Sequence, residues 1–208
     1  MQLLANTTSP FVRIARVAMI EKGIEVEPTI VDPWTDDARL RAANSATRVP
    51  TLVLDDGTAL TECLLIVQWL EAARARPQWP GLLGADAAQV ASVLSRAGLA
   101  IGAIEASTIT IITRKVTAPV LFDETPVGLR RRRSMVEGML RLEAAAGELA
   151  ADASVAPTLD VICAVTLFDY QQFRHGGQPW LPATPRLQAL AEGWRTRQSF
   201  ARTMPRAA

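Results

Sequence analysis

Histidine and cysteine are scarce in this chain. Its 208 residues include one histidine, His175, and two cysteines, Cys63 and Cys163. A single histidine argues against a metal site with several histidine ligands and against a Ser-His-Asp site built elsewhere in the chain, so we expect no metal. Two cysteines cannot form a disulfide framework, and this composition suits a reducing, cytoplasmic compartment.

An excess of charge and a long apolar run are also missing. The 22 basic and 21 acidic side chains give a net charge of +1, which argues against a nucleic-acid partner. No apolar run reaches about 18 residues without a charge, so we expect no membrane partner. The N-terminus lacks the pattern of a signal peptide. Hydrophobic residues make up 49% of the chain, which is ample for a folded core.

The first 76 residues alternate between predicted short strands and helices. Ser9-Pro10 is a favourable helix start, Gly23 is a favourable helix end, and 55–57 (Asp-Asp-Gly) is a hairpin turn signal. The apolar pattern predicts strands over 2–5, 25–31, 49–54 and 58–61, and helices over 9–23, 37–43 and 62–75. This β-α-β-α-β-β-α order predicts an α/β domain over residues 1–76.

The remainder of the chain is predicted to be helical. Residues 77–85 contain two prolines and two glycines and form a predicted linker. Residues 86–208 form a predicted all-helical domain, with helices over 86–115, 126–151, 158–175 and 185–198. The β-branched stretch 107–113 favours a strand by propensity. Its apolar positions continue a helical face that begins at residue 90, so we expect a helix there.

A hydroxyl at the start of the first predicted helix is one candidate binding feature. Ser9 lies where helix N–H groups and the helix dipole favour an anion, including a thiolate. Lowering a thiol pKa by about 2 units requires about 2.7 kcal/mol. A hydrogen bond from a hydroxyl to a charged sulfur, together with the dipole, is of that size. Simple capping of the helix by Ser9 explains the same pattern.

Two further junctions complete the pattern. A cis proline at Val49-Pro50 would leave the backbone of Val49 free to pair with an extended peptide, although an ordinary edge-strand proline explains the motif as well. At Thr61-Glu62-Cys63, backbone N–H groups would hold a carboxylate and Glu62 would take an ammonium, although helix capping by Thr61 is the alternative. Together, the three junctions suit the recognition of a small thiol peptide.

Four stretches of the chain carry a family resemblance: SPFVRIARVAMIEKGIE, NSATRVPTLVLDDGTALTECLLIVQWLE, APTLDVICAVTLFDYQQFR and RLQALAEGWRTRQSFARTMP. They resemble the cytosolic glutathione S-transferase family in its serine-type classes and are similar to bacterial and tau/zeta-like members. The resemblance covers nearly the whole chain. It implies a thioredoxin-like domain, a second domain that is a helical bundle, a homodimer, glutathione as co-substrate and a role in detoxification.

The resemblance also implies roles for individual residues. By position, Ser9 resembles the hydroxyl that contacts the glutathione sulfur, so it would be the catalytic residue. Phe11 follows it as in the tau-type SPF motif and would lie at the glutathione site. Val49 resembles the residue whose backbone pairs with the cysteinyl part of glutathione, and Pro50 resembles the family's cis proline.

The rest of the implied glutathione site departs from the family pattern. Glu62 resembles the clamp for the γ-glutamyl group, but Cys63 stands where that clamp usually has a serine, and a thiol is a weaker donor than a hydroxyl. Arg48 stands where a lysine is common and would reach the glycyl carboxylate. Residues 45–48 lack the usual proline and glycine, and Ile101 stands where many relatives have an acid.

The electrophile is expected to bind between the two domains. Candidate lining residues are Phe11 from the first helix and Ile104, Thr108 and Ile112 from the first long helix of the second domain. Their apolar character implies a hydrophobic electrophile. The sequence thus predicts a glutathione S-transferase that stabilises the glutathione thiolate for attack on such an electrophile.

Two alternatives to this function stay open. A hydroxyl at position 9 cannot form mixed disulfides, which favours conjugation over disulfide exchange. The departures from the family pattern would also fit a non-catalytic binding or interaction protein with the same fold. The other alternative is a thiol-disulfide oxidoreductase that uses Cys63, since a helix N-terminus lowers a thiol pKa. His175 is expected at a helix C-terminus favoured by the dipole, without a catalytic role.

Overall fold

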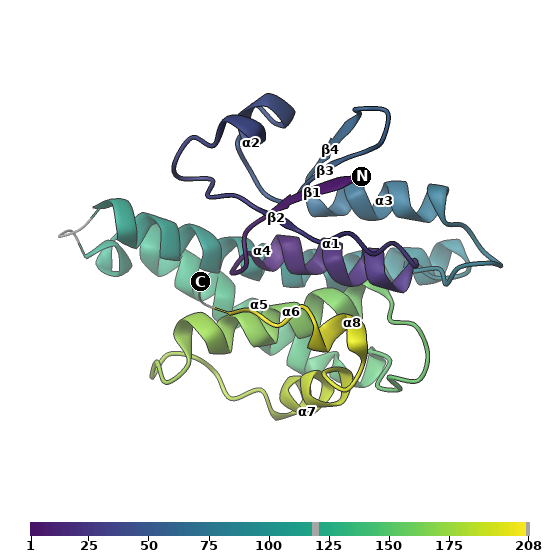
Figure 1. Ribbon diagram of the computed structural model, residues 1–208. Coiled ribbons are helices and arrows are strands. Elements are labelled where there is room, and N and C mark those ends of the chain that lie inside the picture. The colour runs from purple at the N-terminus through teal and green to yellow at the C-terminus, as the bar shows by residue number, and fades with distance from the viewer. Residues whose placement is uncertain (118–120, 207–208) are drawn as a thin grey trace. The chain divides into compact units, whose positions relative to one another are not determined.

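The computed structural model describes residues 1–117 and 121–206 and divides into two compact units (Figure 1). The N-terminal unit comprises Met1–Leu82 and the segment that begins at Gln198, and the second unit is Leu83–Arg197. The sequence analysis instead placed residues 86–208 in one helical domain. The C-terminal segment joins the N-terminal unit because Ser199 donates a hydrogen bond to Glu21, 2.5 Å away, and Arg202 pairs with Glu25.

Four strands of the N-terminal unit form one sheet in the order β2-β1-β3-β4. The strands are β1 (Gln2–Ala5), β2 (Thr29–Ile30), β3 (Thr51–Val53) and β4 (Ala59–Thr61). β1 runs parallel to β2 and antiparallel to β3, and β3 runs antiparallel to β4. This is the predicted thioredoxin-like arrangement, and together with the helical second unit it confirms the predicted fold class.

Two predicted strands are shorter than expected, and prolines account for both differences. Residues 25–31 were predicted as one strand, but only Thr29–Ile30 pairs with β1. Pro28 precedes this pair and has no N–H to donate to a ladder. The strand predicted over 49–54 begins only at Thr51, directly after Pro50.

The helices of the N-terminal unit are α1 (Pro10–Glu21), α2 (Ala38–Ala43), α3 (Cys63–Ala73) and α8 (Gln198–Ala201). The predicted cap is confirmed, because the Ser9 hydroxyl accepts a hydrogen bond from the backbone N–H of Val12 at 3.3 Å. After α1 the chain turns at Gly23, whose φ is +66°. A Cβ there would lie 2.2 Å from the Trp79 ring, so both backbone angle and space require glycine.

The second unit is helical and is built around α6 (Leu159–His175), whose residues are almost all buried. It also contains α4 (Ala87–Thr117), α5 (Pro126–Ala144), α7 (Pro185–Trp194) and the 3-10 turns Phe122–Glu124 and Ala146–Glu148. α4 packs against both α5 and α6. The helix predicted over 126–151 ends earlier, because the chain tightens into the 3-10 turn after Ala144.

The stretch 107–113 is helical, as its apolar spacing indicated and against its β propensity. Three threonine hydroxyls on α4, those of Thr108, Thr110 and Thr113, donate to the carbonyl four residues earlier at 2.8–2.9 Å. By length and composition α4 would also be able to cross a membrane, a property that core helices of soluble proteins share. Here Arg96 of α4 pairs with Asp160 at 2.7 Å, and the helix packs as part of a bundle.

Candidate functional site

The register of the sheet brings the three predicted junctions to one end of the N-terminal unit. Leu4 pairs with Thr51, and Thr51 pairs with Thr61. The chain therefore leaves β1 for Ser9, enters β3 from Pro50, and leaves β4 for Glu62 at the same end of three adjacent strands. Neighbouring strands lie about 4.8 Å apart, so all three segments lie at one small patch of this unit.

The loop between β1 and α1 is held by Asn6. Its side-chain carbonyl accepts hydrogen bonds from the Thr8 N–H at 3.0 Å and from the Thr8 hydroxyl at 2.8 Å. Its backbone carbonyl accepts from the Ser9 N–H at 3.2 Å. The half-buried Ser9 hydroxyl thus has a defined position at the N-terminus of α1. It accepts from Val12 as a cap, and its own proton remains able to donate to an anion.

Val49 has the backbone arrangement expected of a peptide-binding edge. The Val49–Pro50 bond is cis, as predicted, and within the described residues neither backbone group of Val49 forms a hydrogen bond. Two buried polar residues hold the loop before it. Asn44 donates to the Arg48 carbonyl at 3.1 Å, and the Thr51 hydroxyl donates to the same carbonyl at 2.9 Å.

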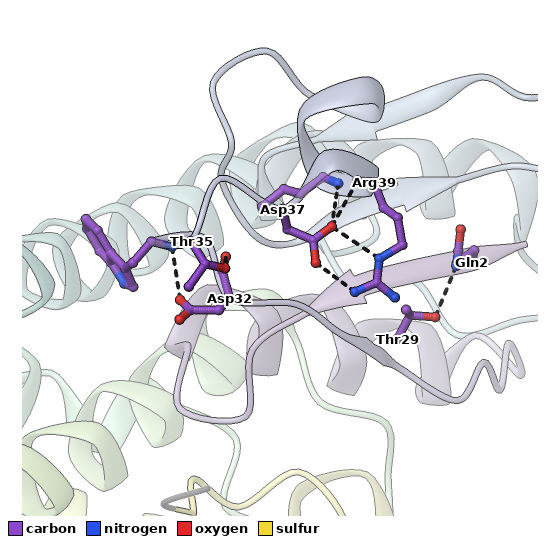
Figure 2. A network of polar contacts seen from close by, with 8 residues as sticks. Gln2, Thr29, Asp32, Thr35, Asp37 and Arg39 are labelled. Carbon is purple, nitrogen blue, oxygen red and sulfur yellow. Dashed lines mark hydrogen bonds and ion pairs between the residues drawn. The ribbon is translucent and has the colours of Figure 1, made fainter.

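Asn44 and Thr51 are positioning residues that the sequence analysis missed. Asn44 donates to the Thr51 hydroxyl at 3.1 Å, so the two side chains form one network under Arg48. Asn44 is also the C-cap of α2, which begins at its N-cap Asp37. Figure 2 shows Asp37 receiving hydrogen bonds from its neighbour Arg39, and the side-chain bond holds the pKa of Asp37 at about 2. The only sequence signal was an asparagine at the predicted helix end.

Thr47 takes a backbone conformation that favours glycine. Its φ is +49°, in the left-handed region, which β-branched residues rarely adopt. The sequence departs here from the glycine and proline usual in the resembling family, and the loop nevertheless keeps the conformation that glycine would take most readily. The Thr47 N–H donates to the Asn44 carbonyl at 2.8 Å, which contributes to holding this turn.

Glu62, like Thr47 and Asp36, is a residue other than glycine with a positive φ. Its φ is +64°, and it is the N-cap of α3 without a side-chain cap hydrogen bond. The carboxylate instead points to Arg48, whose guanidinium lies 2.9 Å away. Strain of this kind costs on the order of 1–3 kcal/mol and is common at ligand-binding positions.

Cys63 differs from the expectation for a thiol at a helix N-terminus. Its side chain is only 4% exposed. Burial raises the pKa of the Cys63 thiol from 9.0 to about 12, and the Glu62 carboxylate adds to the shift, while nearby N–H groups and Arg48 oppose it. The expected lowering of the pKa was wrong, because loss of hydration outweighs the helix terminus. The backbone N–H of Cys63 remains at the start of α3.

Comparisons with known proteins show similarity to glutathione S-transferases. Residues 8–73 match the model "Glutathione S-transferase, N-terminal domain". The uncharacterized GST-like protein YibF of Escherichia coli K12 is 29% identical over 207 residues, which cover 99% of this chain and 98% of that protein. A glutathione S-transferase from Methylobacterium radiotolerans, in complex with glutathione sulfonate, has a TM-score of 0.88 and 27% identity over 100% of this chain and 95% of that one. This chain has the glutathione S-transferase fold, and its residues 8–73 match the N-terminal domain of that family.

A second solved structure has a similar fold. A family member from Pseudomonas fluorescens Pf-5, with bound glutathione, has a TM-score of 0.82 and 25% identity over 99% of each chain. The family match over residues 8–73 includes Ser9, Phe11, the Arg48–Pro50 segment and Glu62-Cys63.

The residues predicted to bind the electrophile occur in both units. Phe11 lies in the first turn of α1 and is half-buried. Ile104, Thr108 and Ile112 share one face of α4, since they are four residues apart. Ile104 is fully buried, whereas Thr108 and Ile112 are half-buried.

Proposed function

We propose that this protein binds glutathione at the Ser9, Val49 and Glu62 end of its sheet and holds the thiolate for attack on an electrophile. The observation that carries the proposal is the convergence of these three segments, each with a polar group suited to one part of the tripeptide. Glutathione supplies the nucleophilic sulfur. The protein supplies the groups that bind and orient it.

Each residue has a distinct role in this proposal. Ser9 donates its hydroxyl proton to the sulfur while still accepting from Val12. The free backbone N–H and C=O of Val49 pair with the cysteinyl part, as in the addition of an extended strand. Glu62 binds the ammonium of the γ-glutamyl group, and the N–H of Cys63 binds its carboxylate. Arg48 binds the glycyl carboxylate.

Calorimetric titration with glutathione tests the binding site. We expect wild-type protein to bind with an affinity between about 1 µM and 1 mM, and Glu62→Ala to lose at least about tenfold in affinity because the ammonium loses its partner. The exposed Arg41 pairs with Asp36 in the same unit, so Arg41→Gln is a matched control that should bind normally. An absence of heat and of thermal stabilisation with glutathione at about 10 mM contradicts the proposal.

The role of Ser9 needs a variant that removes the hydroxyl but keeps the helix start. Glycine caps helices almost as well as serine, so Ser9→Gly is preferred to Ser9→Ala. We expect Ser9→Gly to retain glutathione binding, to raise the pKa of the bound thiol by about 1–2 units, and to lower turnover of an aryl chloride accordingly. Thiolate absorbance as a function of pH measures this pKa directly. An unchanged pKa in Ser9→Gly would show that the hydroxyl does not contact the sulfur.

A non-catalytic binding role is the second candidate, and Cys63 favours it. A buried thiol replaces the stronger hydroxyl donor in the proposed clamp, which weakens the hold on glutathione. Binding without turnover across an electrophile series would support this role. The same burial argues against disulfide exchange by Cys63, because a thiol with a pKa of about 12 contains almost no thiolate at neutral pH.

We also propose a cytoplasmic homodimer with a role in detoxification. Leu64 and Leu65 of α3 are 41% and 52% exposed, an unusual exposure for two adjacent leucines. Sedimentation velocity at micromolar concentration distinguishes monomer from dimer. Substitution of both leucines by serine should shift a dimer towards monomer.

A further inference from the structure

The N-terminal unit contains a cavity of about 300 Å³ whose charged lining residues are mostly basic. Its wall is formed by the loop after β1, one side of α1, the segment that enters β2, and residues 201–206. Among the lining residues that the structure describes, four are arginines and one is an acid: Arg13, Arg16, Arg202, Arg206 and Glu27. Arg48, Val49, Glu62 and Cys63 are not part of this wall.

The segment from Gln198 is what closes the cavity, and specific contacts hold it against α1 and the loop before β2. Arg202 makes a two-pronged ion pair with Glu25, at 3.1 and 3.2 Å. The guanidinium of the buried Arg13 lies 3.3 Å from the sulfur of Met204. Residues 201–206 and residues from the first 30 positions of the chain therefore line one pocket. Tertiary contacts thus hold the side chains of Arg13 and Arg202.

The charges at the cavity are not balanced. Glu25 neutralises Arg202 from outside the wall, and Glu27 is the one lining carboxylate among the described residues. Within residues 1–117 and 121–206, Arg16 and Arg206 have no carboxylate within ion-pair distance. Burial lowers the pKa of Arg16. Glu27 opposes this shift, while the charges of Arg202 and Arg206 add to it, because each of these cations repels the charge of Arg16.

We propose that this cavity is a binding site for a small organic dianion, either a dicarboxylate or a phosphate monoester. A ligand with two negative charges removes the repulsion between Arg16, Arg202 and Arg206 and accepts charge-assisted hydrogen bonds from their guanidinium groups. The volume lies at the lower end of the range for small-molecule pockets, which excludes a polymer. Asn6, Thr7 and Ser9 also line the cavity and supply uncharged hydrogen-bonding groups.

This site goes beyond the proposed glutathione function, because its ligand contacts depend on arginines outside the Val49 and Glu62 segments. Ser9 is the one residue of the proposed glutathione site that also lines the cavity. A dianion in the cavity would thus lie close to the start of α1. The two ligands can be tested separately by variants that affect one site only.

Calorimetric titrations with succinate and with inorganic phosphate test the site and distinguish the two sources of the dianion. Potassium chloride at matched ionic strength controls for general screening. We expect succinate or phosphate to bind with an affinity of about 1 mM or tighter. Arg16→Gln and Arg206→Gln should each weaken binding about tenfold, and Glu27→Gln should strengthen it severalfold because it removes the one repelling carboxylate.

Arg130→Gln is the matched control, since Arg130 is an exposed arginine of α5 outside the cavity and its loss should change nothing. Glutathione affinity is measured on the same variants, and Arg16→Gln should leave it within about twofold. The two affinities are measured independently, so the dianion proposal can still be judged if the protein does not bind glutathione. No binding of either anion at about 10 mM, or equal losses in Arg130→Gln and Arg16→Gln, would overturn the proposal.

Discussion

The guanidinium of Arg48 lies 2.9 Å from the carboxylate of Glu62, so the residue before Val49 and the residue before Cys63 are joined across the proposed glutathione site. The two side chains remain 58% and 46% exposed. An ion pair of this exposure contributes at most about 1 kcal/mol. It therefore holds the two segments close together, and the charged groups of a ligand can easily replace the contact between Arg48 and Glu62.

We expect this ion pair to matter for glutathione binding more than for stability. Arg48→Gln and Glu62→Gln should each change the free energy of unfolding by less than about 1 kcal/mol. Both should weaken glutathione binding, Glu62→Gln by about tenfold and Arg48→Gln by severalfold, because each loses one charge that meets the ligand. Urea denaturation and calorimetry measure the two effects. Large losses of stability with normal glutathione affinity would mean that the pair has a structural role only.

Thr47 provides a prediction about backbone strain. Thr47→Gly should stabilise the protein by about 1 kcal/mol, because glycine takes a φ of +49° without the steric cost that threonine has. Ala46→Gly is the matched control. This neighbour is not at a positive φ, so glycine there should be neutral or destabilising by about 0.5–1 kcal/mol. Denaturant midpoints measure both, and equal effects of the two substitutions would contradict the strain argument.

Cys63 should be almost unreactive in the folded protein. With a pKa of about 12, its thiolate fraction stays very small up to pH 9, so alkylation by iodoacetamide at pH 8 should be far slower than that of a free thiol. The same chain in urea should react at the normal rate, which provides the control. Rapid labelling of Cys63 in the native protein would contradict its burial. Cys63→Ser should tighten glutathione binding, because a hydroxyl is a stronger donor.

We expect the folded protein to lose stability in mild acid because of His175. Its side chain is 1% exposed, and its Nε2 lies 2.9 Å from the Ser107 hydroxyl. Burial lowers the pKa of His175 from 6.5 to about 4, and the charge of Arg114 adds to the shift. The expected position of His175 at a helix C-terminus is confirmed, since α6 ends at this residue, but burial outweighs the helix dipole in its effect on the pKa of His175. The unfolded chain binds more protons between these two pKa values, so stability is full above pH 6.5 and falls as the pH drops towards 4.

Urea unfolding between pH 4 and 7 measures this dependence. His175→Gln should be less stable at pH 7 because the hydrogen bond to Ser107 changes, and it should lose most of the slope between pH 6.5 and 4. The contribution of Asp37 to stability is lost in a different pH range from that of His175. Its pKa is lowered to about 2 by Arg39, so its contribution is present above pH 3.8 and is lost only below that value. An unchanged slope in His175→Gln would show that another group carries the transition.

Local sequence signals predicted much of the N-terminal unit. Ser9 caps α1, Gly23 follows its end at a positive φ, and the hairpin turn at Gly57 joins β3 and β4. Each of these features depends on the conformational preference of a residue or on hydrogen bonds within a few positions. The order of the elements and the positions of Ser9, Val49 and Glu62 follow from such signals, and so does the prediction that they converge.

Tertiary structure alone decided the features that depend on distant neighbours. Burial raises the pKa of Cys63 and lowers the pKa of His175, and in both cases it outweighs the effect of the helix terminus. Burial is set by packing and not by the local sequence. The network of Asn44 and Thr51 and the pairing of Arg202 with Glu25 join residues whose separation in the sequence carries no signal. The sequence therefore determined the local conformations and the order of the elements. The tertiary structure determined which charges are buried, paired or facing a cavity, because a group loses its hydration or gains an ion-pair partner only when the fold brings other groups around it.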